Sequence, residues 1–336
     1  MRFKLFYILM FICMVIFCLA GSAAAEGIAS HRDDEGLVGQ VKAVVVEQAA
    51  VSPDGLESSR ILVRKTHFNP AGYITRVTWY KDNRVYCDKG TQYDSANRVL
   101  ASGHYLTDGS FQQETEFLYD RDGRLKEQRS FKPDLTLFFH KEFLYDESGR
   151  LVAENRYNAD GVLDTGAVYE YNSDGNRAET RYFGSDGVVT LREIYEYSGQ
   201  GYQTIKRTCK DGTADYGSKV YQYGLNGHRL EETDYLTDGS MRHHLVNNYV
   251  STGWKTAQQH YRADGSLASI TIYGPQGLPS AYYTYNNDGS VANGQIFIYK
   301  FDKAGNWIMK ATYQRGQSLS APSIPSEITY RTIAYY

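Results

Sequence analysis

The sequence predicts an all-β protein, a long antiparallel β-meander built from repeated hairpins. An aromatic residue four positions before a glycine recurs from about residue 68 to residue 305. The segments between these glycines are rich in Tyr, Val, Thr and Leu and are bounded by clusters of Asp, Asn, Ser and Gly. Such alternation is typical of strands joined by tight turns.

The repeat has a true period of 26 residues, because the glycine positions lie alternately 12 and 14 residues apart over most of the chain. In a representative hairpin, a three-residue loop ending in a left-handed Gly123 places Tyr119 opposite Leu125. A few positions of the series hold residues that do not easily adopt a positive φ: Arg84, Leu135 and Thr213.

The spacing of the turns also predicts which way the aromatic side chains face. Because side chains alternate between faces along a strand, even intervals keep the repeat aromatics on one face. The one odd interval, between positions 84 and 97, predicts a bulge or an unusual loop near Tyr86 to Tyr93. Strand twist would curl so long a sheet with its aromatic face inward, so we expect an open shell or spiral strip.

Residues 1–25 have the pattern of a secretory signal peptide. Residues 5–20 are continuously apolar, Arg2 and Lys4 precede them, and Ala23 to Ala25 follow. A membrane anchor is the alternative, although the apolar run is short for a span. We therefore expect a mature chain that begins at Glu26, lies in the periplasm or is secreted, and has no membrane span.

The rest of the chain divides into a repeat array and two flanking segments. We expect a leader and capping strands in residues 26–67, the array in residues 68–313, and a loop with a last capping strand in residues 314–336. Terminal elements that differ from the repeat act as caps in repeat proteins.

Charge and cysteine content argue against several functions. A chain beginning at Glu26 has 34 basic and 39 acidic residues, and no Lys/Arg cluster suggests nucleic acid as a partner. Cys87 and Cys209 would lie about ten strands apart in a meander, so a disulfide between them requires tight coiling of the sheet. Their spacing is not that of a metal site, and we expect no metal and no cofactor.

The heptads at 119–125, 145–151 and 301–307, which begin Tyr-Asp or Phe-Asp and carry Gly at the fifth position, resemble the YD repeats of the Rhs and teneurin-like families. The resemblance covers about residues 60–313. It implies a spiralling antiparallel sheet around a hollow chamber, which in secreted bacterial toxins holds a C-terminal toxin domain. Only about 20 residues follow the array here, so the resemblance implies a short, stand-alone envelope protein without that domain. Such relatives are often described as carbohydrate-binding.

Residues suited to catalysis are present without a catalytic pattern. Asp120 to Gly123 resembles half of a calcium loop, but turn-forming Asp explains it better. His243 and His244 are adjacent on a strand and point to opposite faces, which argues against shared metal ligation. Glutamates such as Glu127 and Glu193 could form a glycosidase pair, yet no spacing marks two of them. We expect no enzymatic activity, with an envelope polysaccharide hydrolase as the alternative.

The expected function is a non-catalytic scaffold or binding module that holds a glycan or an envelope protein on rows of tyrosine. The candidate residues are Tyr261, Tyr273, Tyr283 and Tyr285, where the turn spacing becomes an even 12 residues. Tyr261 and Tyr285 should share one edge of the sheet, about 10 Å apart, with Tyr273 at the other edge. The alternative is that these rings pack only from strand to strand.

Overall fold

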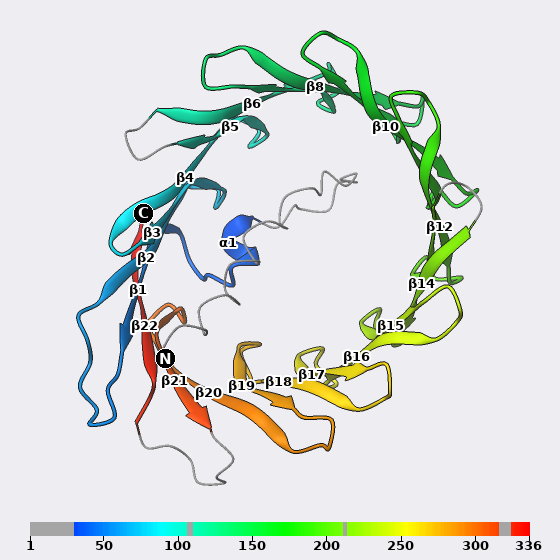
Figure 1. Cartoon of the computed structure of the whole chain (residues 1–336). Helices are drawn as coiled ribbons and strands as arrows, with labels where there is room; N and C mark the ends of the chain where they lie inside the picture. The colour runs from blue at the N-terminus through cyan, green and yellow to red at the C-terminus, as the bar shows by residue number, and fades with distance from the viewer. Residues whose placement is uncertain (1–29, 106–109, 211–213, 316–323) are drawn as a thin grey trace, which may run out of the picture.

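The computed structural model describes residues 30–105, 110–210, 214–315 and 324–336. These residues form one short helix, α1 (His31–Asp34), and a single antiparallel sheet of 22 strands (Figure 1). The strands are β1 (Val41–Ala50), β2 (Ile61–Phe68), β3 (Ile74–Lys81), β4 (Arg84–Tyr93), β5 (Val99–Tyr105), β6 (Phe111–Tyr119), β7 (Leu125–Phe131), β8 (Leu137–Tyr145), β9 (Leu151–Asn158), β10 (Leu163–Tyr171), β11 (Arg177–Gly184), β12 (Val189–Tyr197), β13 (Gln203–Lys210), β14 (Ala214–Tyr223), β15 (Arg229–Tyr235), β16 (Met241–Tyr249), β17 (Lys255–Arg262), β18 (Leu267–Tyr273), β19 (Pro279–Tyr285), β20 (Val291–Phe301), β21 (Trp307–Arg315) and β22 (Glu327–Tyr335).

The sheet closes into a barrel, which corrects the expected open shell or spiral strip. Each strand pairs with the next, and β22 also pairs with β1 along its whole length, from Val41 opposite Tyr335 to Ala50 opposite Glu327 (Figure 1). The all-β, antiparallel part of the prediction is confirmed. Its open form is wrong because the first and last strands, expected as separate caps, satisfy each other's backbone groups and leave no edge.

The repeat hairpins have the predicted loop. Tyr119 lies opposite Leu125, and Gly123, at φ 80°, donates from its backbone N to the carbonyl of Asp120 at 3.1 Å. Leu135 adopts the same left-handed conformation at φ 65° without being glycine. Thr213 lies outside the described residues.

The irregularity predicted near Tyr86 to Tyr93 lies just before that stretch, in the β3–β4 loop. The β3–β4 hairpin has a two-residue loop, Asp82 and Asn83, with both residues at positive φ, and Arg84 already belongs to β4. Cys87 and Val85 pair with Trp79 and Tyr80, which leaves Tyr86 between them as the extra residue of a bulge.

The inner face of the wall is identified by α1, which lies inside the ring of strands (Figure 1). Glu35, which follows α1, forms an ion pair with Arg64 of β2 at 3.1 Å. Residues that pair directly across neighbouring strands lie on the same face. Starting from Arg64, which faces the lumen, the strand registers therefore show which residues of the other strands face inward. Cys87 then faces the lumen and Cys209 the outside, an arrangement that does not suit a disulfide between them.

The repeat aromatics do not stay on one face, contrary to the sequence-based expectation. In every repeat hairpin from β2–β3 to β20–β21, the pairing shifts by one residue next to the turn. This extra residue reverses the alternation in the following strand. Tyr145 and Tyr171 therefore face the lumen, whereas Tyr157, between them in sequence, faces outward and stacks on His140 at 4.8 Å.

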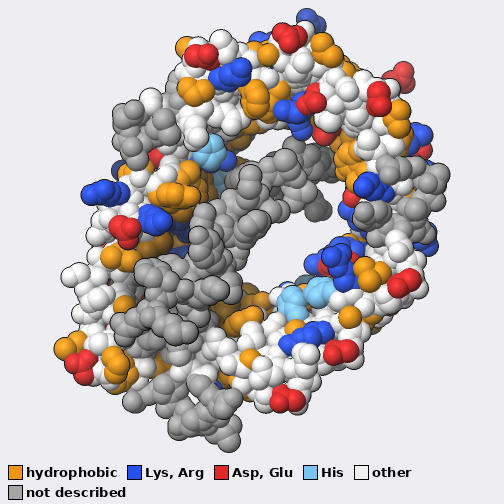
Figure 2. Space-filling model, viewed as in Figure 1, with side chains coloured by type: hydrophobic (Ala, Val, Ile, Leu, Met, Phe, Trp, Pro, Cys, Tyr) orange, Lys and Arg blue, Asp and Glu red, His pale blue; other side chains and the backbone are white. Residues whose placement is uncertain are grey.

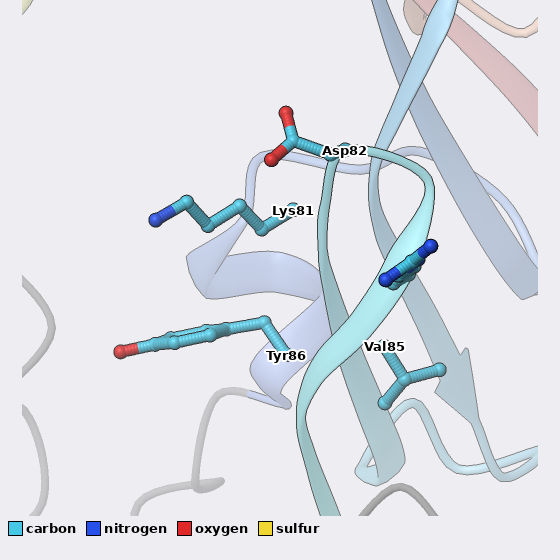
Figure 3. A pocket seen from close by; sticks show the side chains of 5 residues that line it. Lys81, Asp82, Val85 and Tyr86 are labelled. Atoms are coloured by element: carbon cyan, nitrogen blue, oxygen red, sulfur yellow. The ribbon is translucent and has the colours of Figure 1, made fainter.

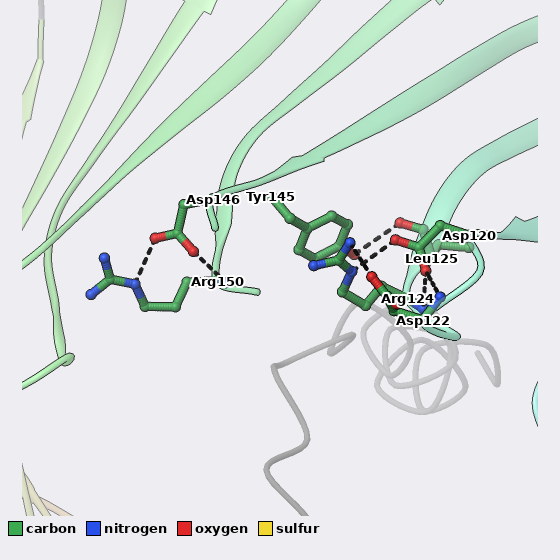
Figure 4. Close-up of polar contacts among 7 residues, drawn as sticks. All are labelled: Asp120, Asp122, Arg124, Leu125, Tyr145, Asp146 and Arg150. Carbon is green, nitrogen blue, oxygen red and sulfur yellow. Dashed lines mark hydrogen bonds and ion pairs between the residues drawn. The ribbon is translucent and has the colours of Figure 1, made fainter. Parts of the chain in front are cut away.

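One rim of the barrel carries a ladder of contacts between successive 26-residue units; we call it the ladder rim. The Asp120 carboxylate accepts hydrogen bonds from the backbone N and the Nε of Arg124, at 2.8 and 2.7 Å (Figure 4). The Arg124 guanidinium lies 5.0 Å from the centre of the Tyr145 ring, and the Tyr145 hydroxyl donates to the carbonyl of Leu125 at 2.8 Å. Asp120, Arg124 and Tyr145 thus connect one 26-residue unit to the next.

The same contacts recur around the ladder rim. The tyrosine hydroxyl donates to a carbonyl twenty residues earlier, in pairs such as Tyr119 to Val99, Tyr171 to Leu151, Tyr197 to Arg177 and Tyr299 to Pro279. The residue after the left-handed turn residue stacks on the next tyrosine at Arg98, Arg150, Tyr202 and His228. Stacking at this position therefore does not require arginine.

The closure is reinforced by the chain segment before β1. Leu37 packs in a buried cluster with Val41, Val44 and Phe68. Asn306, in the β20–β21 hairpin, is only 2% exposed; it accepts from the Val38 backbone N at 2.7 Å and donates to the Val38 carbonyl and the Tyr335 hydroxyl, both at 2.8 Å. The Asn306 side chain thus links the segment before β1 and the end of β22 to the β20–β21 hairpin.

We predict that Gly227→Ala destabilises the barrel more than Gly239→Ala. Both glycines have positive φ, 74° and 79°, so both variants carry a strain of about 1 kcal/mol. A Cβ on Gly227 would also collide with the Tyr202 hydroxyl of the ladder rim, whereas nothing lies within 4 Å of Gly239. Urea denaturation should show an additional loss of about 1–3 kcal/mol for Gly227→Ala. Equal losses would contradict the role given to the ladder.

We also predict that Asn306→Ala costs about 2–4 kcal/mol, because it removes the three hydrogen bonds of a buried side chain and leaves the Val38 backbone N–H and carbonyl without these partners. Asn176→Ala is the matched control: Asn176 also follows a turn glycine, but its side chain makes no hydrogen bond to another described residue. Thermal unfolding should therefore separate the two variants, and similar melting temperatures would argue against the closing role of Asn306.

Candidate functional site

The barrel presents two separate surfaces, the lumen and the outer wall. The space-filling view shows that the described residues surround an opening, with basic, acidic and apolar side chains interleaved around it (Figure 2). Within the part of the chain described, α1 is far too short to cross a bilayer, and no other helix is present that could do so. A ligand site is therefore to be sought on either face of the wall.

The lumen face over β11–β13 holds a largely buried glutamate. Glu193 accepts hydrogen bonds from the hydroxyls of Tyr195 and Tyr182, at 2.6 and 3.3 Å, and pairs with Lys206 at 2.5 Å. Burial would raise the pKa of Glu193, yet these partners lower it below its ordinary value. Burial and the neighbouring Glu193 charge raise the pKa of Tyr182 to about 12. The cluster is a satisfied charge network.

A second polar cluster faces the lumen over β14–β17. The rings of His243 and His260 approach to 3.2 Å between Nε2 and Nδ1, and Lys219 pairs with Glu232 at 2.7 Å and with Asp234 at 3.3 Å. Burial, and then the charge of His243, lower the pKa of His260, which favours its neutral form. The residues described include no group of three or more His, Cys, Asp or Glu side chains able to hold a metal ion.

The described carboxyl groups with resolved pKa shifts all shift in one direction. Every described carboxyl group whose pKa departs from its ordinary value is shifted downward. A glycoside hydrolase needs one carboxylic acid whose pKa is raised, so that it can donate a proton to the leaving group. The glutamates singled out from the sequence, Glu127 and Glu193, both show the opposite shift.

The candidate tyrosines separate into an outer group and one lumen residue. Tyr261, Tyr283 and Tyr285 lie on the outer wall; Tyr261 and Tyr285 are near the rim opposite the ladder rim. Tyr273 lies at the ladder rim and faces the lumen, 5.9 Å below the Lys255 amine. Tyr261 and Tyr285 thus lie at one rim and Tyr273 at the other, which is the arrangement expected for consecutive hairpins of a meander. Their ligand-binding role stays a prediction.

The outer tyrosines differ in how much of each side chain is already engaged. The Tyr283 hydroxyl accepts a hydrogen bond from Arg315 at 3.2 Å, and its ring covers Gly294. Tyr261 stacks on His244 at 5.6 Å. Among the described residues, the hydroxyls of Tyr261 and Tyr285 have no hydrogen-bond partner, in contrast to those of Tyr145, Tyr171 and Tyr197 at the ladder rim. Sequence alone did not separate these two classes, because both share the same distance from glycine.

Two cavities indent the wall. The larger, about 480 Å³, lies at the exposed β3–β4 hairpin, where Lys81 and Tyr86 extend to the same side and Val85 to the other (Figure 3). The smaller, about 280 Å³, lies over β8–β12 beside Lys141, Glu154 and Tyr182. Neither cavity contains one of the tyrosines that the sequence singled out.

Comparison with known proteins gives no family. No protein-family model and no curated protein matches the chain. The Tc holotoxin pore of Photorhabdus luminescens is 11% identical over 80% of this chain and 17% of its own, with a TM-score of 0.38. Porin-like proteins from Bacteroides uniformis and Bacteroides vulgatus are 11% and 12% identical, over 88% and 87% of this chain and 96% and 98% of theirs, with TM-scores of 0.30 and 0.23. The chain thus spans less than a fifth of the toxin chain, and membership of the YD-repeat family stays a prediction.

Sequence reasoning missed the residue after each ladder-rim glycine. A signal was present, because Arg98, Arg124, Arg150, Tyr202 and His228 all have flat side chains and occupy a 26-residue series that only Asn176 interrupts. The stacking partner lies twenty-one residues ahead, on a strand whose position depends on the register.

We predict that Glu193 makes stability depend on pH in the acid range. Its pKa is lower in the folded state, so its contribution is present above the unfolded value, about 4.5, and is lost as the pH falls through the lower folded value. Urea midpoints measured between about pH 6 and pH 3 should fall less steeply for Glu193→Gln than for the wild type. Glu142→Gln, at an exposed position of β8, is the control and should keep the wild-type slope.

Proposed function

We propose that the protein is a non-catalytic scaffold of the bacterial cell envelope that binds a glycan through aromatic side chains on its outer wall. The observation that carries the proposal is the division of the tyrosines into two groups. At the ladder rim, tyrosines such as Tyr145, Tyr171 and Tyr197 have their hydroxyls bound to neighbouring carbonyls, whereas Tyr261 and Tyr285 leave theirs available on the outer wall.

The arrangement of Tyr261 and Tyr285 suits an extended sugar chain. They come from β17 and β19, two strands apart, which corresponds to about 10 Å. Both side chains are half-buried, so their rings are held while part of each surface stays exposed. Stacking of a sugar on each ring would contribute about 1 kcal/mol, which implies weak binding strengthened by repetition along a polymer.

An envelope location rests on the predicted signal peptide, which lies outside the described residues, and on the character of the outer wall. Ion pairs link neighbouring strands on that wall, for example Arg192 with Glu179 at 2.8 Å and Arg76 with Asp88. Charged pairs of this kind suit contact with water. We therefore place the protein in the periplasm or outside the cell.

The downward pKa shifts of the carboxyl groups weigh against the alternative, a polysaccharide hydrolase with a carboxylate pair. Glu193, the most enclosed of the candidates, is held ionised by Lys206 and two tyrosine hydroxyls. An ionised carboxylate with these bonds has little capacity to act as a general acid.

The test is a glycan array probed with the chain from Glu26 onward, followed by calorimetric titration of each glycan retained. The double variant Tyr261→Ala/Tyr285→Ala should weaken binding about 10-fold or more. Tyr157→Ala/Phe183→Ala is the matched control, because these residues lie on the same face and rim, also two strands apart, and it should bind as the wild type does. Unchanged affinity in a folded Tyr261/Tyr285 variant, or no glycan retained, would contradict the proposal.

A further inference from the structure

Two cations face the lumen close to the β1–β22 closure. Arg331 of β22 lies opposite Val46 of β1, which in turn lies opposite the lumen-facing Arg64 of β2. Lys310 of β21 lies opposite Thr329, two residues before Arg331. The side chains of Lys310 and Arg331 are therefore diagonal neighbours on the lumen face. We call these two residues the lumen cation pair.

The carboxylates nearest to the lumen cation pair are engaged elsewhere. Glu35 forms its ion pair with Arg64, at 3.1 Å. Glu327, on the lumen face of β22, accepts hydrogen bonds from the side chains of Gln48 and Thr329, at 3.3 and 3.4 Å. Across the described residues, neither member of the lumen cation pair forms an ion pair or a side-chain hydrogen bond.

Aromatic rings hold the lumen cation pair in place. The Arg331 guanidinium carbon lies 3.7 Å from the centre of the Trp307 ring, and the Lys310 Nζ lies 5.6 Å from the centre of the Phe297 ring. A ring covers one face of a guanidinium and leaves the N–H groups at its edge available for hydrogen bonds. The Arg331 Nε is enclosed, and it has no hydrogen-bond acceptor in the described part of the chain. The rings therefore position the two charges without satisfying their N–H donors.

The surroundings of the lumen cation pair disfavour its charges. Burial lowers the pKa of Arg331 to about 10, and it lowers the pKa of Lys310 against the opposing charge of Glu327. Lys219, another lumen-facing lysine, shows the contrast: burial would lower its pKa, but its hydrogen bond to Glu232 raises it. Two like charges on neighbouring strands, partly removed from water, cost free energy unless an anion compensates them.

We infer that the lumen cation pair is a binding site for an oxyanion, that is, a phosphate, sulfate or carboxylate group. The Arg331 guanidinium and the Lys310 ammonium donate charge-assisted hydrogen bonds to its oxygens. Both side chains are only half-buried, and the described wall surrounds an opening through which a solute can enter (Figure 2). The inference does not depend on the proposed glycan binding, because Tyr261 and Tyr285 lie on the outer wall.

The test is thermal unfolding of the chain from Glu26 onward in sodium phosphate, from about 0.1 to about 50 mM, with the ionic strength held constant by sodium chloride. A ligand that binds only the folded state raises the melting temperature as its concentration exceeds the Kd. We expect the wild type to show this rise. Lys310→Met and Arg331→Met, which keep an apolar side chain and remove the charge, should each weaken phosphate binding about 10-fold or more in calorimetric titration.

Lys219→Met is the matched control. Lys219 pairs with Glu232 at 2.7 Å and with Asp234 at 3.3 Å, so its loss should lower the melting temperature in the absence of phosphate and leave the phosphate response unchanged. Lys310→Met should behave in the opposite way: without phosphate it should melt no lower than the wild type, because the charge that it removes is uncompensated.

Sodium oligogalacturonate, titrated in place of phosphate, distinguishes carboxylates carried on a sugar chain from a free oxyanion. A rise in melting temperature with either anion that both Lys310→Met and Arg331→Met lose supports the inference, and the anion that binds more tightly identifies the source. A wild type that responds to neither anion would overturn it. So would a response that both variants retain, or one that Lys219→Met loses equally.

Discussion

The barrel depends on one repeated interaction at the ladder rim, the stacking of Arg98, Arg124, Arg150, Tyr202 and His228, each at the end of a turn, on a tyrosine of the next 26-residue unit. Arg124 is an example: its guanidinium donates to the carboxylate of Asp120 and packs against the ring of Tyr145. The Tyr145 hydroxyl in turn donates to a carbonyl of the preceding hairpin. Glycine is needed there twice, for its positive φ and for the space that the stacked side chain occupies. At the opposite rim the described glycines serve only the first purpose, since most have nothing within 4 Å.

The turns and the pairing next to them could be predicted from the sequence. The faces of the side chains and the closure of the barrel could not. The three-residue loop and the pairing of Tyr119 with Leu125 follow from turn residues and intervals. The predicted faces were wrong because each hairpin contains one extra, unpaired residue, which the turn intervals do not reveal. Closure was missed because it requires β1 to pair with β22, nearly three hundred residues away, and no repeat motif marks either strand.

The same limit applies to the candidate site. All four tyrosines chosen from the sequence exist as half-buried rings, but the reversal of faces puts Tyr273 in the lumen and Tyr261 and Tyr285 outside. The contrast between satisfied and available hydroxyls needs the neighbouring strand to be known. A closed wall also divides the protein into a lumen and an outer surface, so separate functions can occupy separate faces.

Closure is the central claim, and a single engineered disulfide tests it most directly. Val45 of β1 and Thr332 of β22 lie opposite each other in the closed barrel. In an open strip of 22 strands they would be about 100 Å apart. Val45→Cys/Thr332→Cys, in a chain whose Cys87 and Cys209 are replaced by Ser, should form an intramolecular disulfide, detected by intact mass and by faster migration on a non-reducing gel. Thiols that stay reduced under oxidation in the folded chain would contradict the closed barrel.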